Sequence, residues 1–244
     1  MLVRRPEVIV ALDYPDSESA WALVKRLPAG TWYKVGLELF TRAGPPIIER
    51  LVGEGRDVFL DLKLHDIPNT VAGAVRSASR LGARLLTVHA AGGEAMLRAA
   101  AEAAGEAATA GGGSETPGKD RLRLLAITVL TSLDDAALSA VFGEGSTVEE
   151  TVGRLAGLAR ESGIDGAVSS VNECRAIKLA CGEEFLVVTP GIRLAGQGAQ
   201  DQARVATPEV AMAAGADYLV VGRTITRAED PLGALEKVRT ALIS

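Results

Sequence analysis

The chain repeats one pattern eight times: a short apolar run, then a segment whose apolar residues recur at helical spacing. Continuous apolar runs are typical of strands buried on both faces of a parallel sheet. The expected strands are residues 8–12, 31–35, 57–63, 85–89, 122–128, 166–169, 185–189 and 218–221. A (β/α)8 barrel typically has roughly 250 residues, and the chain has 244. The repeat therefore predicts an α/β protein with one barrel domain over residues 1–244.

An open, doubly wound sheet is the alternative arrangement of such repeats. Its usual mark is a GxGxxG turn after the first strand, and no such turn follows residues 8–12. The Gly-rich connector 111–120 is too short to separate domains, because the alternation resumes after it. Ser146 and Glu149 have capping-box spacing for the helix that runs to residue 162. The unbroken alternation favours the barrel.

Charged residues gather at the expected C-terminal ends of two neighbouring strands. Lys34 ends the second strand, Asp61 and Lys63 end the third, and Asp66 follows in the next turn. Asp61 and Lys63 are two apart, so they share one face of a regular strand. Buried charges are costly unless they are paired or used. At the end of a barrel where active sites lie, these four residues form either a catalytic group or an ion-pair network without function.

A second set of residues is suited to binding an anion. The last strand ends in Gly222 and Arg223. Glycine lets an anion approach the backbone N–H, and the arginine guanidinium can donate two hydrogen bonds to it. The long loop 190–206 after the seventh strand adds Arg193 and Gln202. Barrels often bind phosphate with these two loops. The sequence therefore predicts a phosphate site there, although a solvated Gly-rich connection is the simpler reading of the loop.

Composition and spacing exclude several classes of function. The net charge is −5, which disfavours binding to nucleic acid. No run approaches membrane-spanning length and no apolar signal region begins the chain, so we expect a cytoplasmic protein without membrane contact. Cys174 and Cys181 match no metal or redox spacing. His65 and His89 lack HxH or HExxH spacing, and the nearby lysines repel cations, so we expect no metal.

One stretch resembles the signature of the bacterial orotidine 5′-phosphate decarboxylase family. It reads Asp61-Leu62-Lys63-Leu64-His65-Asp66-Ile67-Pro68-Asn69-Thr70. The resemblance covers nearly the whole chain and includes Ala11-Leu12-Asp13, Lys34-Val35-Gly36, Leu130-Thr131-Ser132, Thr189-Pro190-Gly191-Ile192-Arg193 and Val221-Gly222-Arg223. The stretch is a specific signature, whereas the Gly-Arg ending is common to many phosphate-binding barrels. One departure is Leu64, where bacterial members usually carry Phe.

The resemblance implies a barrel of the ribulose-phosphate-binding type and cofactor-free decarboxylation of orotidine 5′-phosphate to UMP, the last step of de novo UMP (pyrimidine) biosynthesis. It implies a homodimer. Lys63 resembles the proton donor to C6, with Asp61 beside the departing carboxylate. Lys34 resembles the residue that positions this network and the ribose. Asp66 and Thr70 resemble residues that reach the neighbouring subunit's site.

The resemblance assigns further contacts with the substrate. Asp13 resembles a ribose contact and Thr131 a pyrimidine contact. The residues that resemble phosphate contacts are Arg193, Gln202, Gly222 and Arg223. The rest of the signature stretch is also expected near the substrate: Leu62, Leu64, His65, Ile67, Pro68 and Asn69.

Two other functions stay open at this point. Metal-dependent 3-keto-gulonate-phosphate decarboxylases and hexulose-phosphate synthases share the Asp-x-Lys-x-x-Asp pattern. They carry a Glu metal ligand at the end of strand two, where this chain has Lys34. A non-catalytic nucleotide-binding barrel would keep the phosphate residues and could lose Lys63, which is present here.

Overall fold

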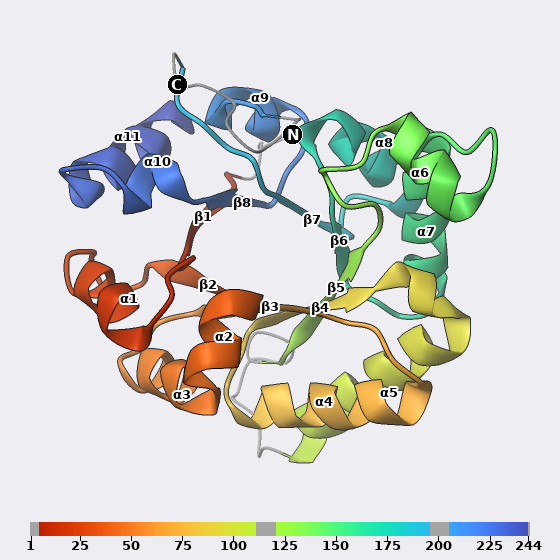
Figure 1. Cartoon of the computed structure of the whole chain (residues 1–244), viewed down its shortest axis with the longest axis horizontal. Helices are drawn as coiled ribbons and strands as arrows, with labels where there is room; N and C mark the ends of the chain where they lie inside the picture. The colour runs from red at the N-terminus through yellow and green to blue at the C-terminus, as the bar shows by residue number, and fades with distance from the viewer. Residues whose placement is uncertain (1–4, 111–120, 196–204, 244) are drawn as a thin grey trace.

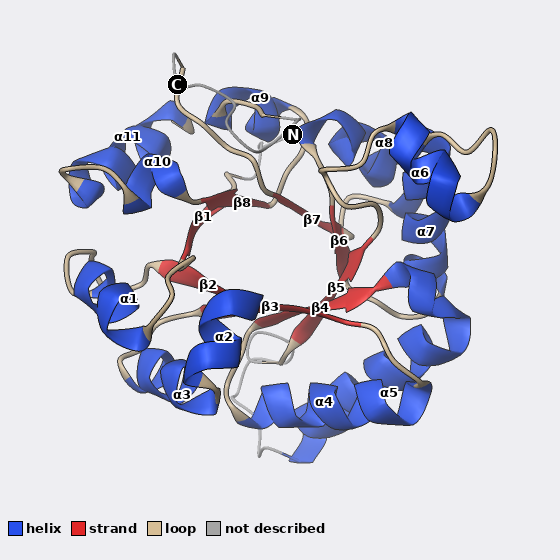
Figure 2. Cartoon of the chain, viewed as in Figure 1, coloured by secondary structure: helices blue, strands red, loops and turns tan. Residues whose placement is uncertain are grey.

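The predicted (β/α)8 barrel is confirmed. The computed structural model describes residues 5–110, 121–195 and 205–243, and the predicted connector 111–120 lies outside these ranges. Eight parallel strands pair in chain order and close into a barrel (Figure 2). Each observed strand begins and ends within one residue of its prediction. The strands are Glu7–Ala11 (β1), Trp32–Gly36 (β2), Val58–Leu64 (β3), Leu85–His89 (β4), Arg123–Ile127 (β5), Gly166–Val168 (β6), Leu186–Thr189 (β7) and Tyr218–Val221 (β8).

Helices surround the barrel as an outer ring (Figure 1). They are Ser17–Val24 (α1), Leu37–Ala43 (α2), Pro45–Gly53 (α3), Pro68–Arg80 (α4), Gly93–Ala110 (α5), Asp135–Phe142 (α6), Val148–Glu161 (α7), Val171–Cys181 (α8), Pro208–Ala213 (α9), Arg223–Thr226 (α10) and Pro231–Ala241 (α11), with a 3₁₀ turn at Ala90–Gly92. None of the helices within the described ranges is long and apolar enough to cross a membrane.

The N-terminus of α7 corrects the predicted capping box by one residue. Thr147, not Ser146, is the N-cap, and its hydroxyl accepts a hydrogen bond from the backbone N–H of Glu150 at 3.3 Å. The sequence offers both registers, because Ser precedes Thr and a second Glu follows Glu149. Burial of Val148, which is 8% exposed, favours the observed register.

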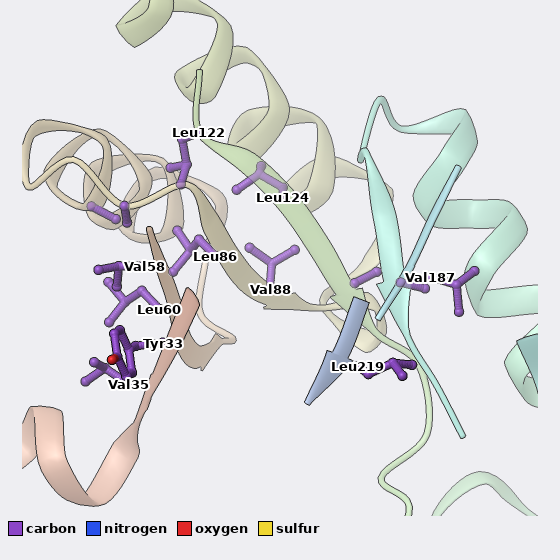
Figure 3. Packing of buried hydrophobic residues seen from close by; sticks show 14 of the residues in the cluster. Tyr33, Val35, Val58, Leu60, Leu86, Val88, Leu122, Leu124, Val187 and Leu219 are labelled. Atoms are coloured by element: carbon purple, nitrogen blue, oxygen red, sulfur yellow. The ribbon is translucent and has the colours of Figure 1, made fainter. Parts of the chain in front are cut away.

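The core has two layers, and their division places the charged residues. Inside the barrel, Phe59 packs with residues of the other strands: Ile9, Ala11, Leu85, Leu125, Leu186, Val188, Tyr218 and Val220. Leu60 belongs to the outer layer between strands and helices (Figure 3). Leu62 is partly buried and packs against this layer. Side chains of β3 therefore alternate as predicted up to Leu62, which places Asp61 on the inner face.

Candidate active site

A cavity of about 760 Å³ opens among the C-terminal ends of the strands. Of the residues predicted from the sequence, it is lined by Asp13, Lys34, Asp61, Lys63, Thr131, Arg193, Gly222 and Arg223. Apolar side chains form much of the remaining wall: Phe59, Ile127, Val129, Leu130, Val168, Ile192 and Val220. The cavity thus combines an apolar wall with convergent charges, which is the usual character of a small-molecule site.

Four charged side chains on the cavity wall lie in a row in which positive and negative charges alternate. Lys34 Nζ lies 2.9 Å from Asp13 Oδ1 and 3.9 Å from Asp61 Oδ2. Lys63 Nζ donates to both carboxylate oxygens of Asp61 at 2.8 Å. The Asp61 side chain is 12% exposed, whereas that of Lys63 is 32% exposed. Asp61 is therefore held between two ammonium groups, and the Lys63 amine lies where a bound molecule can reach it.

The observed cluster of four charges differs from the predicted one in one residue. Asp61 and the two lysines are joined by Asp13 of the same chain, not by Asp66. The exposed Asp66 accepts a hydrogen bond from the backbone N–H of Ile67 at 2.6 Å and does not line the cavity. The reason is the path of the chain, which leaves the barrel after Leu64 to begin α4. Other predicted substrate contacts of the signature stretch are also absent from the lining of their own chain's cavity: Leu62, Leu64, His65, Ile67, Pro68, Asn69 and Thr70.

The backbone of β3 is irregular at Lys63, although Asp61 and Lys63 both line the cavity, as their predicted shared face implies. Among the described residues Lys63 is the only non-glycine with a positive φ, at 50°. The pairing of β3 with β4 shifts between Leu60↔Leu86 and Leu64↔Val88, so residues 61–63 lie opposite Thr87 alone. Such a bulge re-aims a side chain. A left-handed conformation of this kind costs about 1–3 kcal/mol and concentrates at functional sites.

Thr87 is a site residue that sequence reasoning missed. Its hydroxyl oxygen accepts a hydrogen bond from the backbone N–H of Lys63 at 2.8 Å, and the hydroxyl donates to Asp61 Oδ1 at 3.0 Å. Thr87 is fully buried. The available signal was strand alternation: Leu85, Thr87 and His89 are two apart on β4, and Leu85 faces the barrel interior.

Gly36 makes room for the Lys34 ammonium. Lys34 lies within β2 rather than at its end, and Gly36 follows two residues later on the same face. A Cβ atom at Gly36 would lie 2.9 Å from Lys34 Nζ and 3.8 Å from Asp13 Oδ1. Any side chain at position 36 would therefore displace the amine that links the two carboxylates.

Of the predicted phosphate residues, Arg193, Gly222 and Arg223 line the β7–β8 side of the cavity. The base of the long loop is closed by a bridge between Ile192 and Ala206, and the backbone N–H of Arg193 donates to Ala206 O at 2.9 Å. Gln202 lies outside the described residues. Arg227, which sequence reasoning also missed, lines the cavity one helical turn after Arg223. This side of the cavity therefore carries concentrated positive charge.

His65 and His89 stack on each other beside the row of four charged side chains. Their ring centroids are 5.0 Å apart, with an angle of 16° between the planes. Burial, together with His65 and the Lys63 charge, lowers the pKa of His89 from its usual 6.5. Across the part of the chain that the structure describes, no three His, Cys, Asp or Glu side chains form a group that could hold a metal ion.

Comparison with known proteins places the chain among decarboxylases. Orotidine 5′-phosphate decarboxylase from Moorella thermoacetica is 52% identical over 235 residues, which are 96% of this chain and 91% of that protein. The enzyme of the same name from Nitrosococcus oceani is 48% identical over 98% of this chain and 99% of its own. The crystal structure of orotidine 5′-phosphate decarboxylase from Lactobacillus acidophilus superposes with a TM-score of 0.84 at 37% identity, covering 98% of this chain and all of that one. The model of the Orotidine 5′-phosphate decarboxylase / HUMPS family matches residues 6–238. The chain belongs to this family.

Proposed function

We propose that this chain decarboxylates orotidine 5′-phosphate to UMP, in pyrimidine biosynthesis, with protein side chains alone. The proposal rests on one observation: the Asp61 carboxylate lies between Lys34 and Lys63 on the cavity wall. Family membership and the high identity to curated decarboxylases support the reaction. The residue roles below are proposed from the geometry together with the family resemblance.

Binding of substrate would add a negative charge to the row of four charged side chains, which is neutral without it. Asp13, Lys34, Asp61 and Lys63 sum to zero charge, so an orotate carboxylate placed beside Asp61 adds an unpaired negative charge. Two such charges about 4 Å apart repel by about 4 kcal/mol at an effective dielectric constant near 20. This repulsion corresponds to roughly a thousandfold in rate. Loss of CO2 relieves it, but a slow, unactivated decarboxylation requires more.

The larger contribution is assigned to Lys63. As the C6–CO2 bond breaks, its electron pair remains on C6, and an ammonium already fixed nearby stabilises that charge without reorganisation. Lys63 then transfers a proton to C6, which yields UMP and a neutral amine that regains its proton from solvent. The bifurcated hydrogen bond to Asp61 and the left-handed backbone hold the amine in one place beforehand. In this way the geometry supports both stabilisation and protonation.

The signature stretch is divided between two subunits in this proposal. Asp61 and Lys63 serve their own cavity, whereas Asp66 and Thr70 are exposed and serve the neighbour's. Neighbouring residues of the stretch, Leu64, His65, Pro68 and Asn69, act by shaping this turn. A homodimer is then required for catalysis.

Phosphate binding is assigned to the β7–β8 side of the cavity. There the Arg223 guanidinium and the Gly222 backbone are proposed to bind the substrate phosphate. Arg223→Ala is expected to lower kcat/KM for orotidine 5′-phosphate by about 10- to 100-fold, because a hydrogen bond to a charged group is lost. Turnover of orotidine, which lacks the phosphate, is expected to be unchanged by this substitution. Steady-state kinetics with both substrates checks it. The exposed Arg175 on α8 provides a control, and Arg175→Ala should alter neither value; equal losses with both substrates would contradict the assignment.

Substrate identity separates this proposal from its metal-dependent rival. The purified protein is incubated with orotidine 5′-phosphate and, separately, with 3-keto-gulonate 6-phosphate plus Mg²⁺, and the products are identified by chromatography. We expect UMP from the first and no pentulose phosphate from the second. Lys34 supports this outcome, because an ammonium beside Asp61 repels a divalent cation. The reverse result, or tight nucleotide binding without any turnover, would reject the proposal.

A further inference from the structure

We propose that Thr87 is a positioning residue that fixes the geometry of the Lys63–Asp61 pair. Thr87 does not line the cavity, so its effect must pass through the two residues that it holds. The catalytic consequence rests on the proposed decarboxylase function. The positioning itself rests on the hydrogen bonds alone.

The bulge in β3 creates a problem that Thr87 solves. Residues 61–63 have only one residue opposite them on β4, so the Lys63 N–H lacks a regular ladder partner. A buried N–H without a partner is costly. The Thr87 hydroxyl accepts this N–H at 2.8 Å in a fully buried position. It thereby stabilises the left-handed backbone that Lys63 adopts.

The same hydroxyl orients the carboxylate. Because its oxygen accepts from the backbone of Lys63, its proton is directed to Asp61 Oδ1, 3.0 Å away. That carboxylate oxygen also receives the Lys63 amine at 2.8 Å. One hydroxyl therefore contacts the backbone of the proposed proton donor and the side chain that holds its amine. A small rotation of either would move the amine relative to C6, to which catalysis is sensitive.

Three variants separate the hydroxyl from the shape of the side chain. Thr87→Val keeps the branched shape and loses the hydroxyl, whereas Thr87→Ser keeps the hydroxyl. Thr31→Val is the matched control, because Thr31 is equally buried and hydrogen-bonded but lies before β2, at the opposite end of the barrel. If Thr87→Val does not fold, Thr87→Ala replaces it in the comparison with serine.

Turnover and binding should separate in these variants. Thr87→Val is expected to lower kcat for orotidine 5′-phosphate by about 10- to 100-fold, the effect of losing a hydrogen bond to a charged group. The Kd of UMP should stay within about threefold, because Thr87 touches no ligand. Thr87→Ser should recover most of kcat, and Thr31→Val should leave it unchanged. A Thr87→Val enzyme with wild-type kcat, or a serine variant as slow as the valine variant, would overturn the inference.

Hydrogen exchange at the Lys63 amide tests the positioning without reference to the reaction. Thr87→Val should speed exchange of this amide by at least about tenfold, and Thr87→Ser and Thr31→Val should not. If the wild-type protein does not consume orotidine 5′-phosphate but the amide responds in this way, the proposed function fails and the positioning by Thr87 stands. If neither exchange nor kcat responds in an active enzyme, the positioning fails and the function stands.

Discussion

Replacement of Lys63 by alanine is expected to lower turnover of orotidine 5′-phosphate by roughly ten-thousandfold or more, the combined scale of a lost general acid and a lost electrostatic stabiliser. Binding of UMP should weaken by no more than about tenfold, because the product carries no charge at C6 and its proposed phosphate contacts lie across the cavity. Alanine keeps the Cβ atom, so the left-handed backbone at position 63 is no more strained than before. Steady-state kinetics and UMP titration measure the two effects.

Lys63→Arg separates charge from proton transfer. Arginine keeps a cation beside Asp61, but it holds its proton too firmly to serve as the acid. We expect it to bind UMP and to remain strongly impaired in turnover. Lys237 is exposed on α11, and Lys237→Ala should behave as wild type. Normal turnover by Lys63→Ala would refute the role given to this lysine.

If the site is shared between subunits as proposed, a hybrid dimer should recover activity from two inactive subunits. One subunit carries Lys63→Ala and the other Asp66→Ala, with different affinity tags, so that the mixed dimer can be purified. One of its two sites then holds both Lys63 and the neighbour's Asp66, and we expect about half of the wild-type activity per dimer. Each homodimeric variant alone should be nearly inactive.

A second hybrid provides the control. Lys63→Ala paired with Asp61→Ala should be inactive, because both residues are proposed to serve their own subunit, which would leave neither site intact. If Asp66 instead serves its own subunit, the first hybrid will be as inactive as the second. A monomeric variant that keeps full activity would contradict the shared site in a different way.

The fold and much of the site follow from rules that the sequence displays directly. Apolar runs and helical spacing locate all eight strands, and the position of a residue at a strand end predicts that it faces the cavity. Strand ends predict Lys34, Asp61, Lys63 and Arg223 in this way, and all four line the cavity. These predictions succeed because they depend on periodicity, which is a local property of the chain.

The remaining details depend on contacts between strands. The bulge at Lys63 arises from how β3 pairs with β4, which no spacing within β3 reveals. Thr87 reads as an ordinary strand residue until it is placed opposite that bulge. The sequence places Asp66 in its own chain's cluster because it is near in sequence, yet Asp13, which follows β1 and pairs with Lys34 of β2, takes that position. Tertiary placement decides these cases.

The claim that protein side chains alone carry the reaction is tested most directly by turnover after removal of metals. The wild-type enzyme is dialysed exhaustively against EDTA, and the disappearance of orotidine 5′-phosphate is followed by ultraviolet absorbance with UMP and CO2 quantified at the end. We expect an undiminished rate, with one UMP and one CO2 formed for each substrate consumed. A rate that is lost on chelation and regained with Mg²⁺ would contradict it.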